Sequence, residues 1–497
     1  MNLKYKCEPV NGPQKPGTAV FLTSGPRALD ERPELGSFRL LLRPHLASGA
    51  FKGGALETMS LWLGEGGWLL LVGLGDGKKI TEGSLVDAAA KAAKVLGDLG
   101  LKEAVMLLPP SGLGPANSLE LAALGALLAL DRRPDYKSEK KRGDDKPPAL
   151  RTLTLQHAST QDKTPGHRQV LELARLTAES QIMARNLTDR PANLATPDII
   201  AKEAVRLAGE HGLKALVWDE VKLADEGAGG ILAVGSASRH PPRMVVLEHQ
   251  GAAPRGGGPA LALVGKGVTF DSGGLCLKPP ENMHLMKTDM AGAAVVLATM
   301  AAASKLKVRQ PLVGVMPLAE NLVGGAGQRP GDILTTLSGR TVEVMNTDAE
   351  GRLILCDALT LAQKYRPRAL VDLATLTGAC NVALGDKCAG LFSNDSELRK
   401  NIMDLSQSVG EQFWPLPLLD VYEDKIKSDL ADFRESGGRL GGAVVASLFL
   451  RRFIDPEVKW AHMDIVGTAR NGVKTPSCPE GATGFGVRTL LKLICRL

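Results

Sequence analysis

Two acidic residues stand two positions apart in a turn that follows a strand-like run. The stretch NTDAEGRLILCDAL covers residues 346–359, and the alternating run RTVEV precedes it at 340–344. Apolar residues recur at helical spacing after the turn, so Asp348 and Glu350 lie between a predicted strand and a predicted helix. Carboxylates that point at one spot repel unless a cation or a proton lies between them. We therefore expect a cation site at the carboxyl end of this strand, where open α/β sheets bind ligands.

A second stretch has the same organisation and adds two lysines. Residues 261–274 read LALVGKGVTFDSGG, an apolar run followed by a Gly-rich turn, and they contain Lys266 and Asp271. Lys278 follows shortly after, and Asp289 stands in MKTDMAGAAVV. An unpaired lysine is rarely buried, so a lysine within an apolar run that ends in Gly-Lys-Gly indicates a role other than surface decoration.

The residues around these motifs complete the candidate site. Asp289 directly precedes the Ala-rich run 291–303, so we expect it to cap that helix. Gly351 is expected to let the chain turn sharply and approach a bound group, and Arg352 adds a fixed positive charge. Clusters rich in carboxylate oxygens suit divalent metals such as Mg²⁺, Mn²⁺ or Zn²⁺. The candidate site contains Lys266, Asp271, Lys278, Asp289, Asp348, Glu350 and Arg352.

Both stretches resemble the signature motifs of the leucyl aminopeptidase family, the cytosol aminopeptidases or PepA-type dinuclear metallopeptidases. The resemblance is dense over residues 165–497 and looser over the first 150, and NTDAEGR is too long and too rare a match for chance. Four further segments match the family in the same order. They are ARNLTDRPANLATPDII (184–200), ATLTGAC (374–380), WAHMDIVG (460–467) and GATGFGVRTL (481–490).

The resemblance implies a pair of divalent metal ions in each subunit. Lys266, Asp271, Asp289 and Glu350 resemble the ligands of one ion. Asp271, Asp348 and Glu350 resemble those of the other, to which Asp348 also offers its backbone carbonyl. Bridging by Asp271 and Glu350 would hold the ions about 3.5–4 Å apart, as two-metal hydrolases require. The implied cofactors are Mn²⁺ or Zn²⁺, with Mg²⁺ or Co²⁺ as alternatives.

The same resemblance implies how a peptide is hydrolysed. The metal pair would polarise a water molecule and hold the free amino group and the scissile carbonyl of the peptide. Lys278 resembles the lysine that stabilises the negatively charged tetrahedral intermediate. Arg352 resembles the arginine that holds bicarbonate as the general base, which is chemically reasonable because all four carboxylates are assigned to metal. The implied activity is the release of N-terminal residues from peptides with a free N-terminus.

Five mostly apolar residues fall where the family lines its pocket for the side chain that is cleaved off. They are Met286, Thr375, Leu376, Val466 and Ala469. This composition predicts a preference for leucine and other apolar residues.

The rest of the sequence predicts a two-domain α/β protein. Residues 1–160 alternate strand-like and helical runs, and the resemblance gives them a smaller, macrodomain-like α/β fold. Residues 161–190 predict a linking helix, and residues 191–497 predict the catalytic metallopeptidase domain. Apolar runs there alternate with helical stretches, which favours an α/β/α arrangement around a mostly parallel central sheet. These runs are 214–218, 243–248, 260–265, 311–316, 369–373 and 461–465.

Composition is that of a slightly basic, soluble globular protein. A length of 497 residues fits two domains, and 60 basic against 54 acidic residues give a formal charge of +6. The seven cysteines include no CxxC pair, so we expect reduced thiols. No apolar run reaches the ~20 residues of a membrane span, so we expect a cytoplasmic protein without membrane contact. The resemblance implies a homohexamer.

Two other functions stay open at this point. Oxygen-rich dinuclear sites also serve phosphoesterases, and Lys278 and Arg352 could hold a phosphate in such an enzyme. The second alternative is a DNA-binding or regulatory protein, as some relatives are. Nucleic-acid binding is not indicated, however, because no stripe of Lys and Arg follows one helix face.

Overall fold

The chain folds into two compact units, which a computed structural model describes for most residues. The amino-terminal unit comprises residues 1–179, 408–410 and 473–480, and the carboxy-terminal unit comprises 180–407, 411–472 and 481–497. The division falls within the long helix α4 (His167–Asp189). The domain boundaries expected at residues 160 and 190 flank this helix and stay predictions. The described residues are 1–9, 12–14, 16–25, 29, 32–109, 112–138, 149–157, 164–251 and 259–496.

The amino-terminal unit contains a six-stranded sheet. Every neighbouring pair of strands is parallel except the β3–β4 pair at one edge. The strand order is β1 (Asn2–Cys7), β6 (Thr152–His157), β5 (Glu103–Leu107), β2 (Gly17–Leu22), β4 (Trp68–Gly73) and β3 (Thr58–Trp62).

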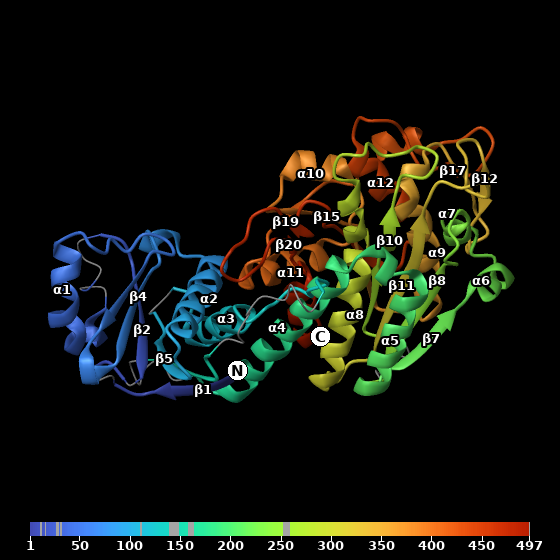
Figure 1. Cartoon of the computed structure of the whole chain (residues 1–497). Coiled ribbons are helices and arrows are strands. Elements are labelled where there is room, and N and C mark those ends of the chain that lie inside the picture. The colour runs from blue at the N-terminus through green and yellow to red at the C-terminus, as the bar shows by residue number, and fades with distance from the viewer. Residues whose placement is uncertain are drawn as a thin grey trace. The chain divides into compact units, whose positions relative to one another are not determined.

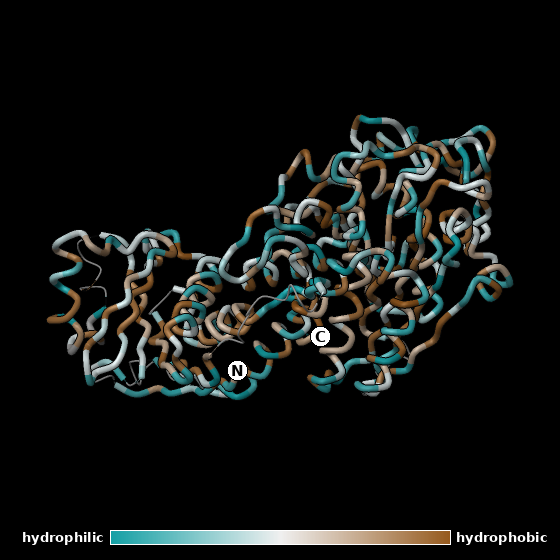
Figure 2. The backbone as a smooth tube through the Cα atoms, viewed as in Figure 1, coloured by the Kyte–Doolittle hydropathy of each residue, from teal (hydrophilic) through white to brown (hydrophobic). Residues whose placement is uncertain are grey.

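Alternate residues of these strands pack into two separate layers. Ala19 and Phe21 of β2 pack with α2 (Glu82–Asp98) and α3 (Pro115–Leu128). Val20 and Leu22 point to the opposite face, where they pack with α1 (Arg39–Ala47) through Leu42. This is the expected consequence of the two-residue period of a strand. Figure 2 shows the apolar residues that run along these strands.

The carboxy-terminal unit is built on a nine-stranded sheet. Its pairs are parallel except β7–β8, β8–β11 and β15–β18, so the sheet is mostly parallel, as predicted. The strand order is β16 (Phe413–Pro415), β15 (Ala389–Ser393), β18 (Lys459–Asp464), β14 (Ala369–Ala374), β9 (Leu261–Gly265), β11 (Leu312–Asn321), β8 (Arg243–His249) and β7 (Lys214–Trp218), with β10 (Gly267–Asp271) also beside β11.

Helices cover both faces of this sheet and confirm the predicted α/β/α layering. One face carries α4, α5 (Pro197–His211), α8 (Ala291–Lys305), α11 (Ser396–Ser408) and α13 (Val487–Arg496). The other face carries α6 (Glu220–Glu226), α7 (Gly229–Gly235), α9 (Glu350–Lys364) and α12 (Gly442–Arg451). A short helix, α10 (Gly378–Leu384), packs in a smaller cluster. Figure 1 shows α8 and α9 on opposite sides of β10 and β11.

The apolar segment Met283–Lys305 passes through the middle of this unit. Among the described residues it is the one helical stretch with the length and hydropathy of a membrane span. Its most apolar window is 78% buried within the fold, because α8 packs between the sheet and α13. The segment therefore forms part of the core.

Two small sheets accompany the large one. Strands β12 (Ile333–Thr335), β13 (Thr341–Glu343) and β17 (Phe433–Arg434) form one, and β19 (Arg470–Asn471) and β20 (Gly481–Ala482) form the other. The predicted strand 340–344 is β13. It lies in a side sheet and is not one of the strands of the large sheet.

Candidate metal centre and active site

Lys266 stands at an interruption between two strands. Both β9 and β10 pair with the same long strand, β11, and Lys266 is the residue between them. Its backbone N–H donates to the Leu373 carbonyl of the neighbouring strand β14 at 3.0 Å. The side chain is buried, and its Nζ lies 2.8 Å from Asp289 Oδ2, 2.9 Å from Glu350 Oε1 and 2.8 Å from the Thr375 carbonyl oxygen. The interruption between the two strands thus lets the Lys266 ammonium contact the carboxylates of Asp289 and Glu350.

Asp271 ends β10 and is followed by a tight glycine turn. Gly273 has a φ of +85°, and a Cβ at this position would lie 2.8 Å from Asp348 Oδ1, so no other residue fits without displacing that carboxylate. The turn brings Lys278 back to the site. Its Nζ lies 2.7 Å from Asp271 Oδ2 and 2.5 Å from Asp348 Oδ1.

Asp348 and Glu350 are brought together by a change of helix type. The segment Thr347–Ala349 is a single 3₁₀ turn, and α9 begins at Glu350. Asp348 and Glu350 therefore lie in helical backbone and not in an extended segment. Asn346 stabilises the turn by accepting a hydrogen bond from the Asp348 N–H at 3.0 Å. Asp271, Asp348 and Glu350 each offer an oxygen within 4.8 Å of the others.

Asp289 does not cap the following helix, in contrast to the prediction. It lies in the 3₁₀ segment Met283–Met290, and α8 begins without a side-chain cap. Asp289 Oδ1 instead accepts hydrogen bonds from Lys266 Nζ at 2.8 Å and from Thr375 Oγ1 at 2.7 Å. Its carboxylate therefore faces the site.

The carboxylates are poorly neutralised by the protein itself. Burial and the neighbouring Asp271 raise the pKa of Glu350 to about 8, and burial raises the pKa of Asp289 to about 6. Burial lowers the pKa of Lys266, but the surrounding carboxylates outweigh it and raise this pKa above its ordinary value. Glu350 Oε2 is buried and has no hydrogen-bond partner among the described residues. The cluster has four carboxylates but only two ammonium groups, and one buried carboxylate oxygen has no hydrogen-bond partner among the described residues. Divalent cations would compensate this negative charge.

Arg352 lies two residues after Glu350 in α9 and is buried. Its Nη1 donates to the Glu435 carbonyl oxygen at 2.5 Å. Its Nε has no hydrogen-bond partner among the described residues, and burial lowers the pKa of the guanidinium. A buried cation with a spare donor suits an anion.

A cavity of about 610 Å³ opens beside the cluster. Asp348, Arg352 and Leu376 line it together with Met345, Asn346, Ala349, Thr377, Gly378, Ala379, Arg434, Ser436, Gly437, Gly438, Arg439 and Gly442. Of the five residues predicted for the side-chain pocket, only Leu376 lines this cavity. Thr375 contacts Asp289, and Ala469 is packed in the core. Met286 and Val466 are partly buried. Their assignment to a pocket stays a prediction.

Three buried polar residues support the site and were not found from the sequence. Asn321 donates to Asp271 Oδ1 at 2.8 Å and to the Thr347 carbonyl oxygen at 2.9 Å. Glu435 accepts hydrogen bonds from the Met345 and Asn346 N–H groups at 2.7 and 2.5 Å. Asp464 accepts from Thr377 Oγ1 at 2.6 Å. The one available signal was the position of Asn321 at the carboxyl end of an apolar run.

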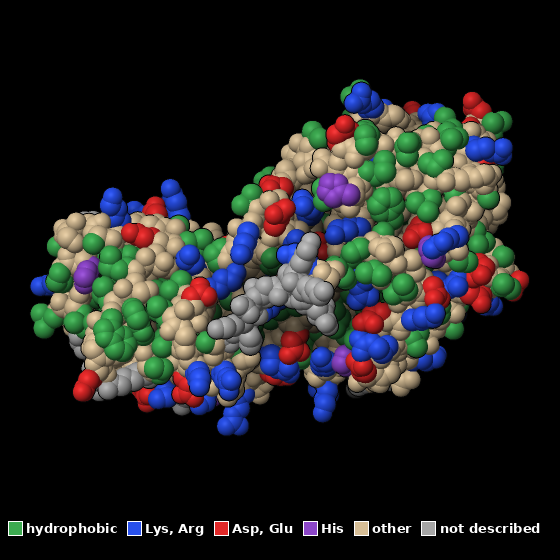
Figure 3. Space-filling view, viewed as in Figure 1, with side chains coloured by type: hydrophobic (Ala, Val, Ile, Leu, Met, Phe, Trp, Pro, Cys, Tyr) green, Lys and Arg blue, Asp and Glu red, His purple; other side chains and the backbone are tan. Residues whose placement is uncertain are grey.

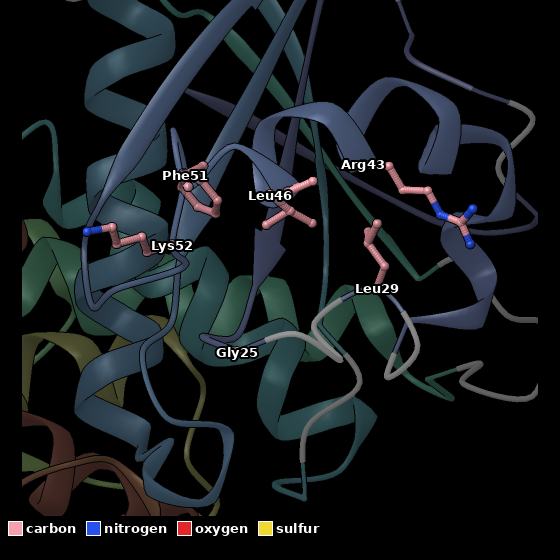
Figure 4. A pocket seen from close by; sticks show the side chains of 8 residues that line it. Gly25, Leu29, Arg43, Leu46, Phe51 and Lys52 are labelled. Carbon is pink, nitrogen blue, oxygen red and sulfur yellow. The ribbon is translucent and has the colours of Figure 1, made fainter.

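A second cavity, of about 680 Å³, lies in the amino-terminal unit. Figure 4 shows Leu46 and Phe51 toward its interior, whereas Arg43 and Lys52 extend away from one another. Among the described residues that line it, the two cations do not converge on one point.

Two family models match the chain. The model described as the cytosol aminopeptidase family, catalytic domain, matches residues 182–491. The model described as the N-terminal domain of the same family matches residues 25–140. The first match contains every residue of the charged cluster.

Relatives and solved structures agree with these matches. A probable cytosol aminopeptidase of Syntrophotalea carbinolica is 45% identical over 452 residues, which cover 90% of each chain. One of Desulfovibrio desulfuricans is 44% identical over 433 residues, covering 86% and 85% of the two chains. A tomato leucine aminopeptidase variant has a TM-score of 0.87 at 30% identity, covering 100% of this chain and 97% of that chain. The bottromycin maturation enzyme BotP in complex with Mn has a TM-score of 0.83 at 32% identity, covering 97% and 99%.

Proposed function

The chain belongs to the cytosol aminopeptidase family of metal-dependent hydrolases, and from this premise we propose that it releases leucine and other apolar residues from the N-terminus of peptides. The observation that carries this proposal is the buried cluster of four carboxylates and two lysines beside an open cavity. The relatives support an aminopeptidase, and the cluster supplies the groups that such a reaction needs.

Two divalent ions are the proposed cofactors, Mn²⁺ or Zn²⁺ with Mg²⁺ or Co²⁺ as alternatives. Lys266, Asp271, Asp289 and Glu350 would hold one ion, and Asp271, Asp348 and Glu350 the other. The unpartnered Glu350 Oε2 and the proximity of the Asp271, Asp348 and Glu350 oxygens support this assignment. When bound, such ions supply Lewis acidity and lower the pKa of a water molecule toward neutrality.

Lys278 is proposed to stabilise the negative charge that develops on the carbonyl oxygen of the cleaved bond. Its ammonium is held by Asp271 and Asp348, and about 21% of its side chain is exposed, so it can face a substrate. A fixed positive charge in a partly enclosed site stabilises a transition state because the charge needs no reorganisation during the reaction.

Arg352 is proposed to hold a bicarbonate ion that accepts a proton from the attacking water. The burial of the guanidinium and its unpartnered Nε support an anion at this position. The four carboxylates of the cluster are assigned to metal, so an external base is chemically reasonable.

The proposed pocket for the released side chain consists of Met286, Thr375, Leu376, Val466 and Ala469. The hydrogen bond from Thr375 Oγ1 to Asp289 supports a pocket beside one proposed metal ion. Four of the five residues are apolar, and this composition supports a preference for leucine.

We also propose a cytoplasmic homohexamer. The name of the relatives supports the location. Exposed apolar side chains on the carboxy-terminal unit, including Val382, Val421 and Leu440, support association between copies. On the face shown in Figure 3, Lys and Arg side chains are interspersed with Asp and Glu, an arrangement unlike that of a nucleic-acid-binding surface.

Three substrates test the proposal. Purified protein should cleave Leu-p-nitroanilide, should not cleave N-acetyl-Leu-p-nitroanilide, and should not cleave p-nitrophenyl phosphate. Chelation should abolish the first activity and added Mn²⁺ or Zn²⁺ should restore it. Faster cleavage of the phosphate ester would identify a phosphoesterase instead, and equal cleavage of the acetylated substrate would exclude an aminopeptidase.

A further inference from the structure

The cavity beside the charged cluster has a basic wall. Three arginines line the cavity, Arg352, Arg434 and Arg439. Among the described residues that line the cavity, Asp348 is the one acidic residue, and it is already paired with Lys278 at 2.5 Å. The lining therefore has an excess of positive charge, and the cavity attracts anions.

One nitrogen of the Arg434 guanidinium is held by a hydrogen bond, and the other two are available as donors. Arg434 ends β17, is half-buried, and its Nε donates to the Lys425 carbonyl oxygen at 2.9 Å. No described residue pairs with its two terminal nitrogens. A guanidinium with one anchored nitrogen and two open ones is suited to a carboxylate, which it binds through parallel hydrogen bonds.

Arg439 follows Arg434 by five residues, and Gly437 and Gly438 lie between them. It is exposed and forms no ion pair within the part of the chain that the structure describes. Gly438 leaves open space beside this wall, since a Cβ at that position would meet no atom within 4 Å.

Glu435 neighbours Arg434 in the sequence, and its carboxylate partly offsets the charge of Arg352. Its carboxylate is fully buried and accepts the N–H groups of Met345 and Asn346. It is not among the residues that line the cavity.

The position of this wall identifies which part of a peptide would meet it. A free α-amino group is a cation, so the arginines repel it and the carboxylates attract it. Asp289 lies beside Thr375 and does not line the cavity, whereas Asp348 does. A peptide whose first residue lies at the Asp289 side therefore extends its second residue through the cavity toward Arg434 and Arg439.

We propose that Arg434 and Arg439 bind a carboxylate on the residue that follows the cleaved bond, so that the enzyme favours peptides with an acidic second residue or a free carboxyl terminus there. This inference rests on the aminopeptidase function proposed above and names its substrate class.

Matched peptides test the inference with charge as the one variable. The value of kcat/KM is measured for Leu-Glu-amide, Leu-Gln-amide and Leu-Gln with a free carboxyl terminus. We expect kcat/KM for Leu-Glu-amide to exceed that for Leu-Gln-amide by about two- to fivefold, the discrimination that a partly exposed ion pair gives. A similar gain for Leu-Gln with a free terminus shows that the terminal carboxylate is also bound.

Variants assign the effect to the two arginines. The Leu-Glu-amide to Leu-Gln-amide ratio should fall toward 1 in Arg434→Gln with Arg439→Gln, and it should fall partly in Arg439→Gln alone, which disturbs no hydrogen bond between described residues. Lys400→Gln removes the same charge from an exposed pair with Asp404 on α11 and should keep the wild-type ratio.

Each failure has a distinct meaning. A wild-type ratio of 1 or below overturns the inference while the proposed function stands, and so does a ratio that persists in Arg439→Gln and in the double variant. Absence of cleavage of all three peptides and of Leu-p-nitroanilide overturns the proposed function and this inference with it.

Discussion

Gly351 and Lys266 fit together with no space for a side chain between them. A Cβ at Gly351 would lie 2.5 Å from Lys266 Cε and 2.7 Å from Nζ. Gly351 is in the first turn of α9 and has ordinary helical backbone geometry, so the sharp turn expected from the sequence is not its role. Its role is to let Lys266 cross the start of the helix and reach Glu350.

This contact predicts that Gly351→Ala damages the site while the helix stays intact. The added methyl group must displace Lys266, and small displacements of a site residue can cost about 10²-fold in rate. We expect a loss of bound metal, measured by elemental analysis, together with a loss of peptidase activity. The control is Gly209→Ala in α5, where a Cβ meets open space. That variant should gain up to about 1 kcal/mol of helix stability and keep its metal. Normal metal content in Gly351→Ala would contradict the packing argument.

Asn321 links the two motifs that the sequence identified separately. Its amide donates to Asp271 of one motif and to the Thr347 carbonyl oxygen next to Asp348 of the other. Removal of such a supporting group typically weakens metal binding by about 10–100-fold. Asn321→Ala should therefore show this loss in a metal titration. Asn394→Ala breaks hydrogen bonds with Val458 and Trp460 instead, and it should lower thermal stability without changing metal affinity. Equal metal affinities in the two variants would refute the role of Asn321.

Much of the fold was predictable because it depends on local pattern. The six apolar runs expected in the carboxy-terminal unit all became strands, since a buried strand needs a short run of apolar residues. The short strands β10, β15 and β16 of the large sheet were missed. In β10 the sequence around Asp271 reads as a Gly-rich loop, and only its pairing with β11 makes it a strand. The side sheet that contains β13 was also missed, because sheet membership depends on pairing with β17, about 90 residues away.

The site, too, was predictable only in part. The charged residues share two motifs, and local sequence was enough to group them. The side-chain contacts could not be predicted. Asp289 has the sequence position of a helix cap, but the buried ammonium of Lys266 offers it a stronger, charge-assisted bond. Glu435 lies 83 positions from Arg352, and only the folded chain brings its carbonyl oxygen to that guanidinium.

Asp357 gives a prediction about stability and pH. It is buried in α9 and accepts the Ile231 N–H at 2.9 Å and the Leu337 N–H at 2.8 Å, while burial raises its pKa from 3.8 to about 7. The folded state therefore holds this proton at pH values where the unfolded state has lost it. The free energy of unfolding should fall as pH rises from about 4 to about 7, by up to about 1.4 kcal/mol per pH unit from this group.

Asp357→Asn isolates that contribution. The variant loses one acceptor at every pH, so its stability is offset from wild type, but it lacks the titration. The free energy of unfolding is measured in urea at several pH values. The value for wild type minus the value for the variant should fall as pH rises. The carboxylates of the metal cluster titrate in both proteins and cancel in this difference. Parallel stability curves would show that Asp357 stays ionised when folded.

Lys278 and Lys266 both contact carboxylates of the cluster, yet the proposed roles of the two lysines differ. Lys266 is a proposed metal ligand and its side chain is only 3% exposed, whereas the Lys278 side chain is 21% exposed and is proposed to face the substrate. Lys278→Ala should lower kcat by about 10²–10³, the usual cost of losing one charged donor to the transition state. Its metal content should stay near two ions per chain. Lys266→Ala should lose one ion as well as activity. An active Lys278→Ala enzyme, or one that has lost a metal ion, would show that this lysine does not act as the electrophile.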